Sequence, residues 1–202
     1  MPTLWSPRLS CRTLVLPVIL SFAGAAHAAD ERAVRKEVVV PAPVEAVWRS
    51  WTTQEGIQSF FAPEAVVEAR VGGPFHIHID PYGKPGSKGA DDMRFLALQP
   101  PKMLSFDWNA PPSMPEVRQQ RTFVVVRLAD VDGKSTRVSL HHTGWGDGGE
   151  WDKAYAYFDV AWGRVLNNLR QRHEQGPIDW TGWLETLRKA HEEADKAAAA
   201  PK

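Results

Sequence analysis

The stretch from Asp152 to Glu174 constrains the fold more than any other part of the sequence. Apolar side chains recur there at alternating intervals of three and four residues, which places them in one stripe along a helix. The stripe is bulky and aromatic in its first half and aliphatic in its second half, so it needs a broad, concave apolar partner. A curved β-sheet is such a partner. The stripe consists of Tyr155, Phe158, Trp162, Val165 and Leu169.

The chain before this helix supplies the strands of such a sheet. Segments with alternating apolar and polar side chains are separated by turns rich in glycine and proline, a pattern typical of antiparallel strands. We expect strands at residues 34–40, 66–71, 75–79, 93–98, 103–108, 122–128 and 137–143. The sequence therefore predicts an α+β protein, in which a curved antiparallel sheet wraps around one long C-terminal helix.

Shorter elements complete the expected fold. A helix is predicted to begin near Pro43 and to end near Thr52, because proline suits the first turn of a helix, where its missing N–H costs nothing. A second short helix is expected over residues 54–60. Residues 81–92 are rich in glycine, proline and lysine, which indicates a mobile loop. Two short helices thus follow the first strand.

The first residues carry the features of a secretory signal peptide. Arg8 and Arg12 form a basic region, and residues 14–25 form an apolar run that is too short to span a bilayer comfortably. Ala26-His27-Ala28 has the small-x-small pattern of a cleavage site. We therefore expect residues 1–28 to be a signal peptide that is cleaved after Ala28, and the mature protein to be periplasmic or secreted. An uncleaved membrane anchor is the alternative.

Loss of the leader changes the composition of the chain. Cys11 is the only cysteine, so the mature protein would have no disulfide and no cysteine-based metal site. Without Arg8 and Arg12, 22 lysines and arginines face 24 acidic residues, a net charge of about −2. Such a charge does not indicate binding to nucleic acids or to anionic membranes. The remaining residues suit one domain, which we place at residues 33–175.

A separate segment, residues 176–202, follows the domain. Gly176-Pro177 interrupts the long helix, and Trp180, Trp183, Leu184 and Leu187 then recur at helical spacing before an alanine-rich tail. The simpler interpretation is a short helix that docks on the outside of the domain. A homodimer contact through this helix is the alternative, because an apolar stripe that begins with aromatic residues needs a partner.

Five motifs occur in order along the chain, at residues 39–48, 51–52, 71–75, 98–108 and 136–144. Together they resemble the activator of heat-shock-protein-90 ATPase homologue family of the START-like (SRPBCC, Bet v-type) superfamily. The resemblance covers roughly residues 34–175 and implies the helix-grip fold. It does not imply a single activity, since members of this superfamily bind varied apolar ligands and only some are enzymes. A protein exported from the cytosol would meet neither the chaperone nor its ATP, so we expect no co-chaperone activity.

The aromatic residues at inward positions are more numerous than a compact core usually needs, which favours a cavity for a small hydrophobic molecule, a lipid or an aromatic compound. This cavity is predicted between the sheet and the long helix. No cofactor, no nucleic-acid partner and no membrane span in the mature chain are expected. The predicted ligand-binding residues are Trp51, Phe60, Phe61, Phe75, Phe106, Trp108, His142, Tyr155, Phe158 and Trp162.

His142 has two interpretations. Strand alternation places it on the same face as Val138 and Leu140, near the mouth of any cavity. The simpler interpretation is a core histidine that is hydrogen-bonded to a neighbouring strand or to a tyrosine of the long helix. As a ligand contact, it could also serve proton transfer in a cofactor-free cyclase, dehydratase or hydrolase, provided that a titratable partner lies within reach. A protein-interaction module is the third hypothesis, and no catalytic residue is assigned.

Two further patterns carry less weight. His76 and His78 lie two residues apart on one face of a strand, but two ligands do not make a metal site, and no metal is expected. The glycine-rich segment 144–149 lacks the lysine and hydroxyl residue of a phosphate-binding loop. We interpret it as a flexible lid, in which Trp145 and Trp151 help to close the pocket.

Overall fold

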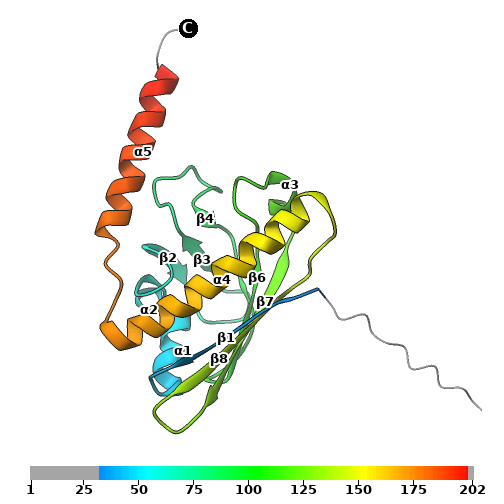
Figure 1. The fold of residues 1–202 in the computed structure, drawn as a ribbon, viewed down its shortest axis with the longest axis vertical. Helices are drawn as coiled ribbons and strands as arrows, with labels where there is room; N and C mark the ends of the chain where they lie inside the picture. The colour runs from blue at the N-terminus through cyan, green and yellow to red at the C-terminus, as the bar shows by residue number, and fades with distance from the viewer. Residues whose placement is uncertain (1–31, 200–202) are drawn as a thin grey trace, which may run out of the picture. The chain divides into compact units, whose positions relative to one another are not determined.

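The computed structural model, which describes residues 32–199, contains an antiparallel sheet packed against a long helix (Figure 1). The predicted fold class, α+β with a helix-grip arrangement, is confirmed. The predicted leader lies outside the described residues. The main sheet has five antiparallel strands in the order β1 (Val34–Val40), β8 (Thr136–Thr143), β7 (Thr122–Asp130), β6 (Met103–Trp108) and β5 (Phe95–Gln99).

A second, three-stranded sheet extends the first around the core. It contains β2 (Glu64–Val67), β3 (Phe75–His78) and β4 (Gly89–Ala90). A bridge between Pro74 and Arg94 joins the two sheets. The strand β4 lies inside the segment that was expected to be only a mobile loop, so this expectation was wrong at its C-terminal end. Gly89 allows the pairing, because a Cβ there would lie 2.3 Å from the carbonyl oxygen of Ile77.

The helices α1 (Val44–Thr52) and α2 (Gln54–Gln58) follow β1, as predicted. Thr53 separates them and caps α2, since its side-chain oxygen accepts a hydrogen bond from the backbone N–H of Gly56 at 2.9 Å. The proline-rich connection after β6 contains one helix that was not predicted, α3 (Pro115–Arg118). The side chain of Glu150 holds its start by accepting hydrogen bonds from two backbone N–H groups of α3.

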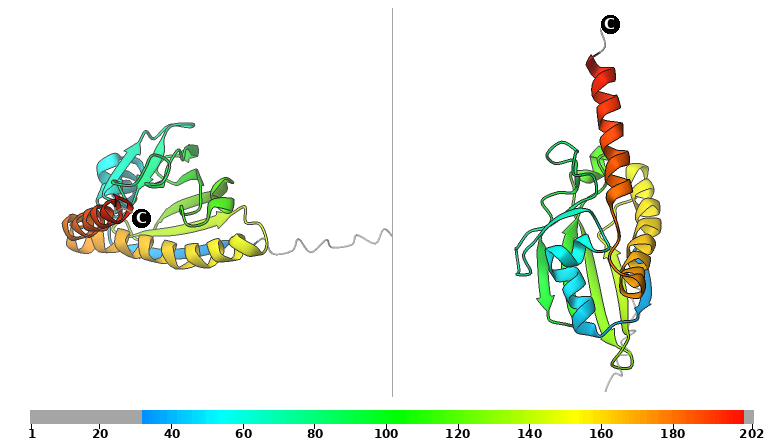
Figure 2. Two further views of the ribbon diagram at one scale, coloured as in Figure 1. Left: turned by 90° about the horizontal axis from the view of Figure 1, so that it is seen from above. Right: turned by 90° about the vertical axis from the view of Figure 1, so that its left-hand side faces the viewer.

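The long helix α4 (Gly149–Gln175) lies along β1 (Figure 2). Its buried residues keep the predicted helical period, but the stripe is wider than predicted. Leu166 is buried, whereas Val165 and Tyr155 are only half-buried at the margins. Because the sheet is concave, it contacts residues on both sides of the predicted stripe, and this widens the buried face of the helix. The buried residues of α4 are Ala154, Phe158, Trp162, Leu166 and Leu169.

The last helix, α5 (Thr181–Ala199), has no buried residue, and it is held to the domain by a few polar contacts. The indole N–H of Trp180, just before the helix, donates to the carbonyl oxygen of Gln58 at 2.6 Å, and that of Trp183 donates to the carbonyl oxygen of Ile79 at 3.0 Å. Over residues 32–199, no helix combines the length and the apolar character needed to cross a bilayer.

Candidate functional site

Much of the space under α1 and α2 is filled by aromatic rings. Phe106 lies at the centre of this cluster, with its ring centroid 4.4 Å from that of Phe75 and 6.4 Å from that of Trp51. Phe60 packs edge-on against Trp51 at 5.2 Å. All four side chains are fully buried. These four predicted ligand-binding residues therefore contact one another in a packed core.

A pocket with a volume of about 330 Å³ opens beside the first half of α4. This volume is at the low end of the range of about 300–1,000 Å³ that is typical of sites for small molecules. Its walls come from α4, from the end of β6 with the residues that follow it, and from the segment around β4. Phe61, Trp108, Phe158 and Trp162 are the predicted residues that line it. The other lining residues are Ile79, Asp80, Ser87, Lys88, Gly89, Ala90, Asn109, Ala110, Pro111, Pro112, Tyr157, Ala161 and Val165.

Tyr155 does not line this pocket. Its hydroxyl group donates to the carbonyl oxygen of Ala33 at 3.2 Å, and the guanidinium of Arg32 lies 4.4 Å from the centre of its ring. A cation at that distance over a tyrosine ring is a favourable contact. Tyr155 thus holds the segment just before β1 against α4.

His142 is fully buried and has two hydrogen-bond partners. Its Nδ1 accepts the indole N–H of Trp162 at 2.9 Å, so the neutral ring carries its proton on Nε2 and donates it to the hydroxyl oxygen of Thr122 at 2.7 Å. The Thr122 hydroxyl in turn donates to the carbonyl oxygen of Trp108. Burial lowers the pKa of His142 to about 3, so the ring is neutral at pH 7.

These contacts give His142 the structural role that the sequence favoured, with β7 as the neighbouring strand. The predicted tyrosine partners are not used. Neither Thr122 nor Trp162 titrates near neutral pH, and His142 does not line the pocket. The titratable partner required for proton transfer is therefore missing, and the geometry does not support His142 as a catalytic group.

The glycine-rich segment before α4 does not form a lid over the pocket, contrary to our interpretation. Trp145 lies over His142 instead, with ring centroids 4.2 Å apart, and its indole N–H donates to the backbone carbonyl oxygen of the same histidine at 2.8 Å. Neither Trp145 nor Trp151 lines the pocket. This segment closes the His142 end of the core, because a large indole ring fits between the end of β8 and the start of α4.

The charged side chains that line the pocket have partners. Asp80 lies 2.7 Å from the Nε2 atom of His191 in α5, and the amino group of Lys88 lies 3.7 Å from the carboxylate of Glu64. Asn109 differs from both. It is 6% exposed, and its side-chain oxygen has no hydrogen-bond donor within reach among the described residues.

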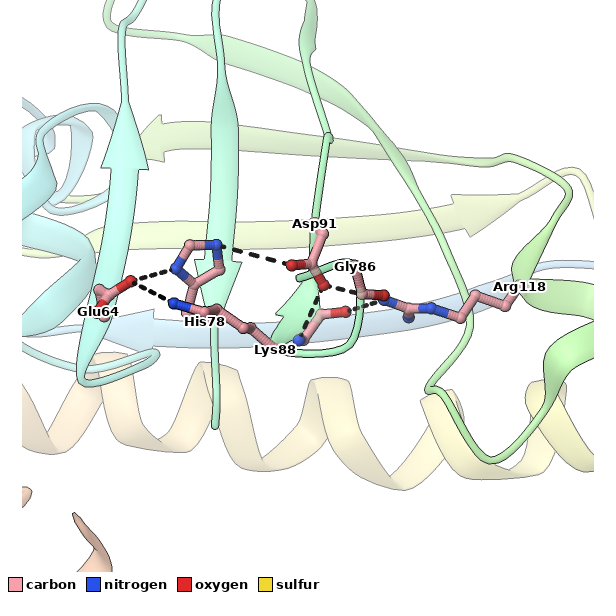
Figure 3. Close-up of polar contacts among 7 residues, drawn as sticks. Glu64, His78, Gly86, Lys88, Asp91 and Arg118 are labelled. Carbon is pink, nitrogen blue, oxygen red and sulfur yellow. Dashed lines mark hydrogen bonds and ion pairs between the residues drawn. The ribbon is translucent and has the colours of Figure 1, made fainter. Parts of the chain in front are cut away.

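Arg118 of α3 contacts two walls of the pocket, and Figure 3 shows its contacts with the segment around β4. Its guanidinium donates to the carbonyl oxygens of Gly86 and Gly89 at 2.6 and 2.9 Å, and to the carboxylate of Asp91 at 3.0 Å. It also donates to the carbonyl oxygen of Ala110, on the segment that follows β6. Arg118 therefore fixes the segment around β4 relative to the end of β6.

The histidine pair on β3 belongs to the same region. The Nδ1 atom of His78 lies 2.5 Å from the carboxylate of Glu64, and its Nε2 atom lies 3.9 Å from that of Asp91 (Figure 3). Desolvation lowers the pKa of His76. Over residues 32–199, no cluster of three or more histidine, cysteine or acidic residues is arranged to hold a metal ion.

Sequence reasoning missed Asn109 and the segment around β4 as parts of the site. Asn109 follows directly after a predicted strand and precedes a proline-rich stretch, and neither feature indicates that its side chain is buried. The change from strand to loop after Trp108 was the only available signal. It marks where a strand ends, but not what lies across from that end.

Comparisons with known proteins identify relatives. The family profile described as "Activator of Hsp90 ATPase homolog 1-like protein" matches residues 41–174. A search of curated proteins found no match.

Among solved structures, the protein MLL2253 from Mesorhizobium loti is 23% identical, with a TM-score of 0.57, over 73% of this chain and 100% of that one. The Aha1 dimer from Colwellia psychrerythraea is 20% identical, with a TM-score of 0.55, over 72% of this chain and 98% of that one. CalU16 from Micromonospora echinospora is 21% identical, with a TM-score of 0.53, over 82% and 87%. At these identities, the three structures show a shared fold.

Proposed function

This chain belongs to the family of Activator of Hsp90 ATPase homolog 1-like proteins, and we propose that it binds a small, neutral hydrophobic molecule in the pocket beside α4. The family and its fold support a ligand-binding type of domain. The observation that carries the proposal is the open pocket of about 330 Å³, which is lined by aromatic rings at a place where the rest of the core is filled.

The size and lining of the pocket favour an aromatic compound over a long-chain lipid. A volume at the low end of known sites would leave most of an extended acyl chain outside. The ring centroids of Trp108 and Trp162 lie 5.3 Å apart, and Phe158 stacks on Trp162 at 6.2 Å. These flat surfaces suit the offset or edge-on packing that aromatic rings prefer.

The charges around the pocket favour a neutral ligand. Asp80 and Lys88 are each satisfied by a partner outside the pocket, His191 and Glu64 respectively. A charged ligand would have to compete with these partners or enter without a counter-ion, and burial of an unpaired charge is costly. An uncharged aromatic molecule meets neither obstacle.

Binding of naphthalene, followed by quenching of tryptophan fluorescence, tests the proposal. We expect saturable binding by the wild-type protein and at least tenfold weaker binding by Ala161→Phe, because the added ring would occupy the pocket that Ala161 lines. Val160→Phe is the matched control, since Val160 lies next in the chain but is 54% exposed and does not line the pocket. Absence of saturable binding, or equal weakening by both substitutions, would refute the proposal.

The proposed function includes export. The sequence features of residues 1–28 support removal of a signal peptide after Ala28. Intact mass measurement of the protein recovered from a periplasmic or culture-medium fraction should then give a chain that begins at Ala29. A full-length chain in the cytosol would contradict export. We also propose that this protein does not stimulate the Hsp90 ATPase, which a direct ATPase assay with added protein would test.

Dimerisation through α5 remains a proposal for the terminal segment. It is supported by Trp183, which is 44% exposed, and by Leu184 and Leu187, which are only half-buried on the same helix. Analytical ultracentrifugation should show a dimer that dissociates when both leucines are replaced by asparagine. A wild-type protein that is monomeric at high micromolar concentration would rule this contact out.

A further inference from the structure

We propose that the ligand carries a neutral hydroxyl group, which forms a hydrogen bond with the side-chain amide of Asn109 in the same pocket. This inference rests on the proposed function and adds to it the chemical class of the ligand: an aromatic alcohol or phenol rather than a plain hydrocarbon. Three observations support it, namely the burial of Asn109, the lack of a partner for its Oδ1 atom, and the pairing or exposure to water of the other charged and hydroxyl groups around it.

Asn109 is buried but unpaired. It is 6% exposed, and its Oδ1 atom has no donor within reach in the part of the chain that the structure describes. Most buried polar side-chain atoms in proteins are hydrogen-bonded, so each exception needs an explanation. A ligand that supplies the missing donor explains why a polar side chain lies in an aromatic pocket.

The backbone on either side of Asn109 is fixed. The carbonyl oxygen of Trp108 accepts from the Thr122 hydroxyl group, and the carbonyl oxygen of Ala110 accepts from the Arg118 guanidinium. These bonds hold the position of the Asn109 Cα atom, while its Oδ1 atom has no donor among residues 32–199. Such an arrangement pre-organises the amide for an outside partner without use of its own hydrogen-bonding groups.

The other polar groups that line the pocket differ from Asn109. Asp80 and Lys88 are paired with His191 and Glu64, and Ser87 and Tyr157 are exposed to water. Within residues 32–199, Asn109 is thus the lining residue whose side chain has a buried polar atom without a partner. Recognition of a polar group on the ligand falls to this residue.

A hydroxyl group fits the amide better than a charged group does. The Asn109 side chain offers an acceptor at Oδ1 and donors at Nδ2. Because Oδ1 is closed to solvent in the ligand-free protein, a rotation about the soft χ2 torsion has to bring it to the pocket when the ligand binds. A hydroxyl group donates to Oδ1 and accepts from Nδ2. A carboxylate cannot donate to Oδ1, and an ammonium group cannot accept from Nδ2.

Three probes of similar shape test this inference: naphthalene, 2-naphthol and 2-methoxynaphthalene, of which only 2-naphthol has a hydroxyl group. We expect the wild-type protein to bind 2-naphthol about tenfold more tightly than 2-methoxynaphthalene, because a site with a buried polar group discriminates against an analogue that leaves it unpaired. Asn109→Leu should bring this ratio close to one, because leucine offers no polar group to the hydroxyl of 2-naphthol. Ser87→Ala, which removes an exposed polar group of the same pocket, should keep the ratio.

The outcomes separate this inference from the proposed function. If naphthalene binds but the wild-type protein does not prefer 2-naphthol, the inference is wrong, while the pocket remains a ligand site. A preference that persists in Asn109→Leu also overturns it. If none of the three probes binds saturably, the proposed function itself fails. The comparison of probes on the wild-type protein needs no variant, so the test does not depend on the folding of Asn109→Leu.

Discussion

Two buried polar side chains lie close to the first half of α4, and they differ in their hydrogen-bond partners. His142 is fully buried between the hydroxyl group of Thr122 and the indole N–H of Trp162, and both of its ring nitrogens are used. Asn109 is nearly as buried and lines a pocket, yet its side-chain oxygen has no partner in the described chain. The region beside α4 therefore contains one buried polar side chain with all its partners, His142, and one with an unpaired oxygen, Asn109.

The difference shows how a cavity fold can divide its polar groups between structure and recognition. A buried polar group with internal partners adds specificity to the core and has no capacity left for a ligand. A buried polar group without partners makes the empty protein less stable, and it can recover that energy only when something binds. On this reasoning, His142 belongs to the fold and Asn109 to the ligand. Four measurements can break or sharpen this contrast.

The largest effect is expected from His142→Leu. Leucine leaves the Trp162 indole N–H without an acceptor and removes the donor to the Thr122 oxygen, and each buried partner lost in this way costs about 1–3 kcal/mol. We expect the free energy of unfolding, measured by urea denaturation at pH 7, to fall by about 4 kcal/mol. His141→Ala is the control, because His141 is the next residue and is exposed. A loss below about 1 kcal/mol would show that these hydrogen bonds contribute little to the fold.

The pH dependence of stability gives the next largest effect. Burial lowers the pKa of His142 to about 3 in the folded state, below the usual value of 6.5, so the unfolded chain binds the proton more readily. Stability from this group is therefore fully present above pH 6.5 and is lost as the pH falls toward 3. We expect the wild-type protein to lose about 3 kcal/mol more than His142→Leu between pH 7 and pH 4. Equal losses would mean that His142 titrates normally in the folded protein.

Arg118→Met tests whether ligand binding in the pocket requires the two segments that Arg118 holds together. The substitution removes the half-buried guanidinium shown in Figure 3. Asp91 and the carbonyl oxygens of Gly86 and Gly89 then lose a hydrogen-bond donor. We expect the free energy of unfolding to fall by about 2 kcal/mol and naphthalene to bind about tenfold more weakly. His142→Leu should change naphthalene binding less, because His142 does not line the pocket.

Arg188→Met is the matched control for Arg118→Met. Arg188 forms an exposed ion pair with Glu192 on α5, and such pairs contribute only about 0.3–0.5 kcal/mol. If both arginine substitutions had the same effect on naphthalene binding, the hydrogen bonds of Arg118 would not determine the shape of the pocket.

Sequence periodicity was enough to predict the elements that build the fold. The stripe of α4 and the alternation in the strands depend on which face is buried, and each side chain on such a face carries that information locally. The exceptions are short elements whose form depends on distant partners. The strand β4 exists because Gly89 and Ala90 pair with β3, and α3 begins where Glu150 accepts from its backbone N–H groups.

The pocket was harder to predict, because inward direction and access to a cavity are different properties. Phe75 and Phe61 both point into the core, but Phe75 contacts Phe106 and Phe95 closely, whereas Phe61 lies at the edge of the packed region. The position of the void depends on two loops that Arg118 holds together, and no periodic pattern marks their contact. Asn109 acquires its significance only from that three-dimensional arrangement.

The smallest expected change in stability is that of Asn109→Leu. It gives the most direct comparison between Asn109 and His142. Among the described residues, the Oδ1 atom of the wild-type side chain has no hydrogen bond to lose, and leucine removes this buried, unmet acceptor. We therefore expect the free energy of unfolding to stay the same or to rise by up to about 1 kcal/mol, in contrast to the large loss in His142→Leu. Urea denaturation without ligand measures both variants on one scale. A loss of more than about 1 kcal/mol in Asn109→Leu would mean that this amide supports the fold as His142 does, since removal of a group without a structural role leaves no partner unpaired.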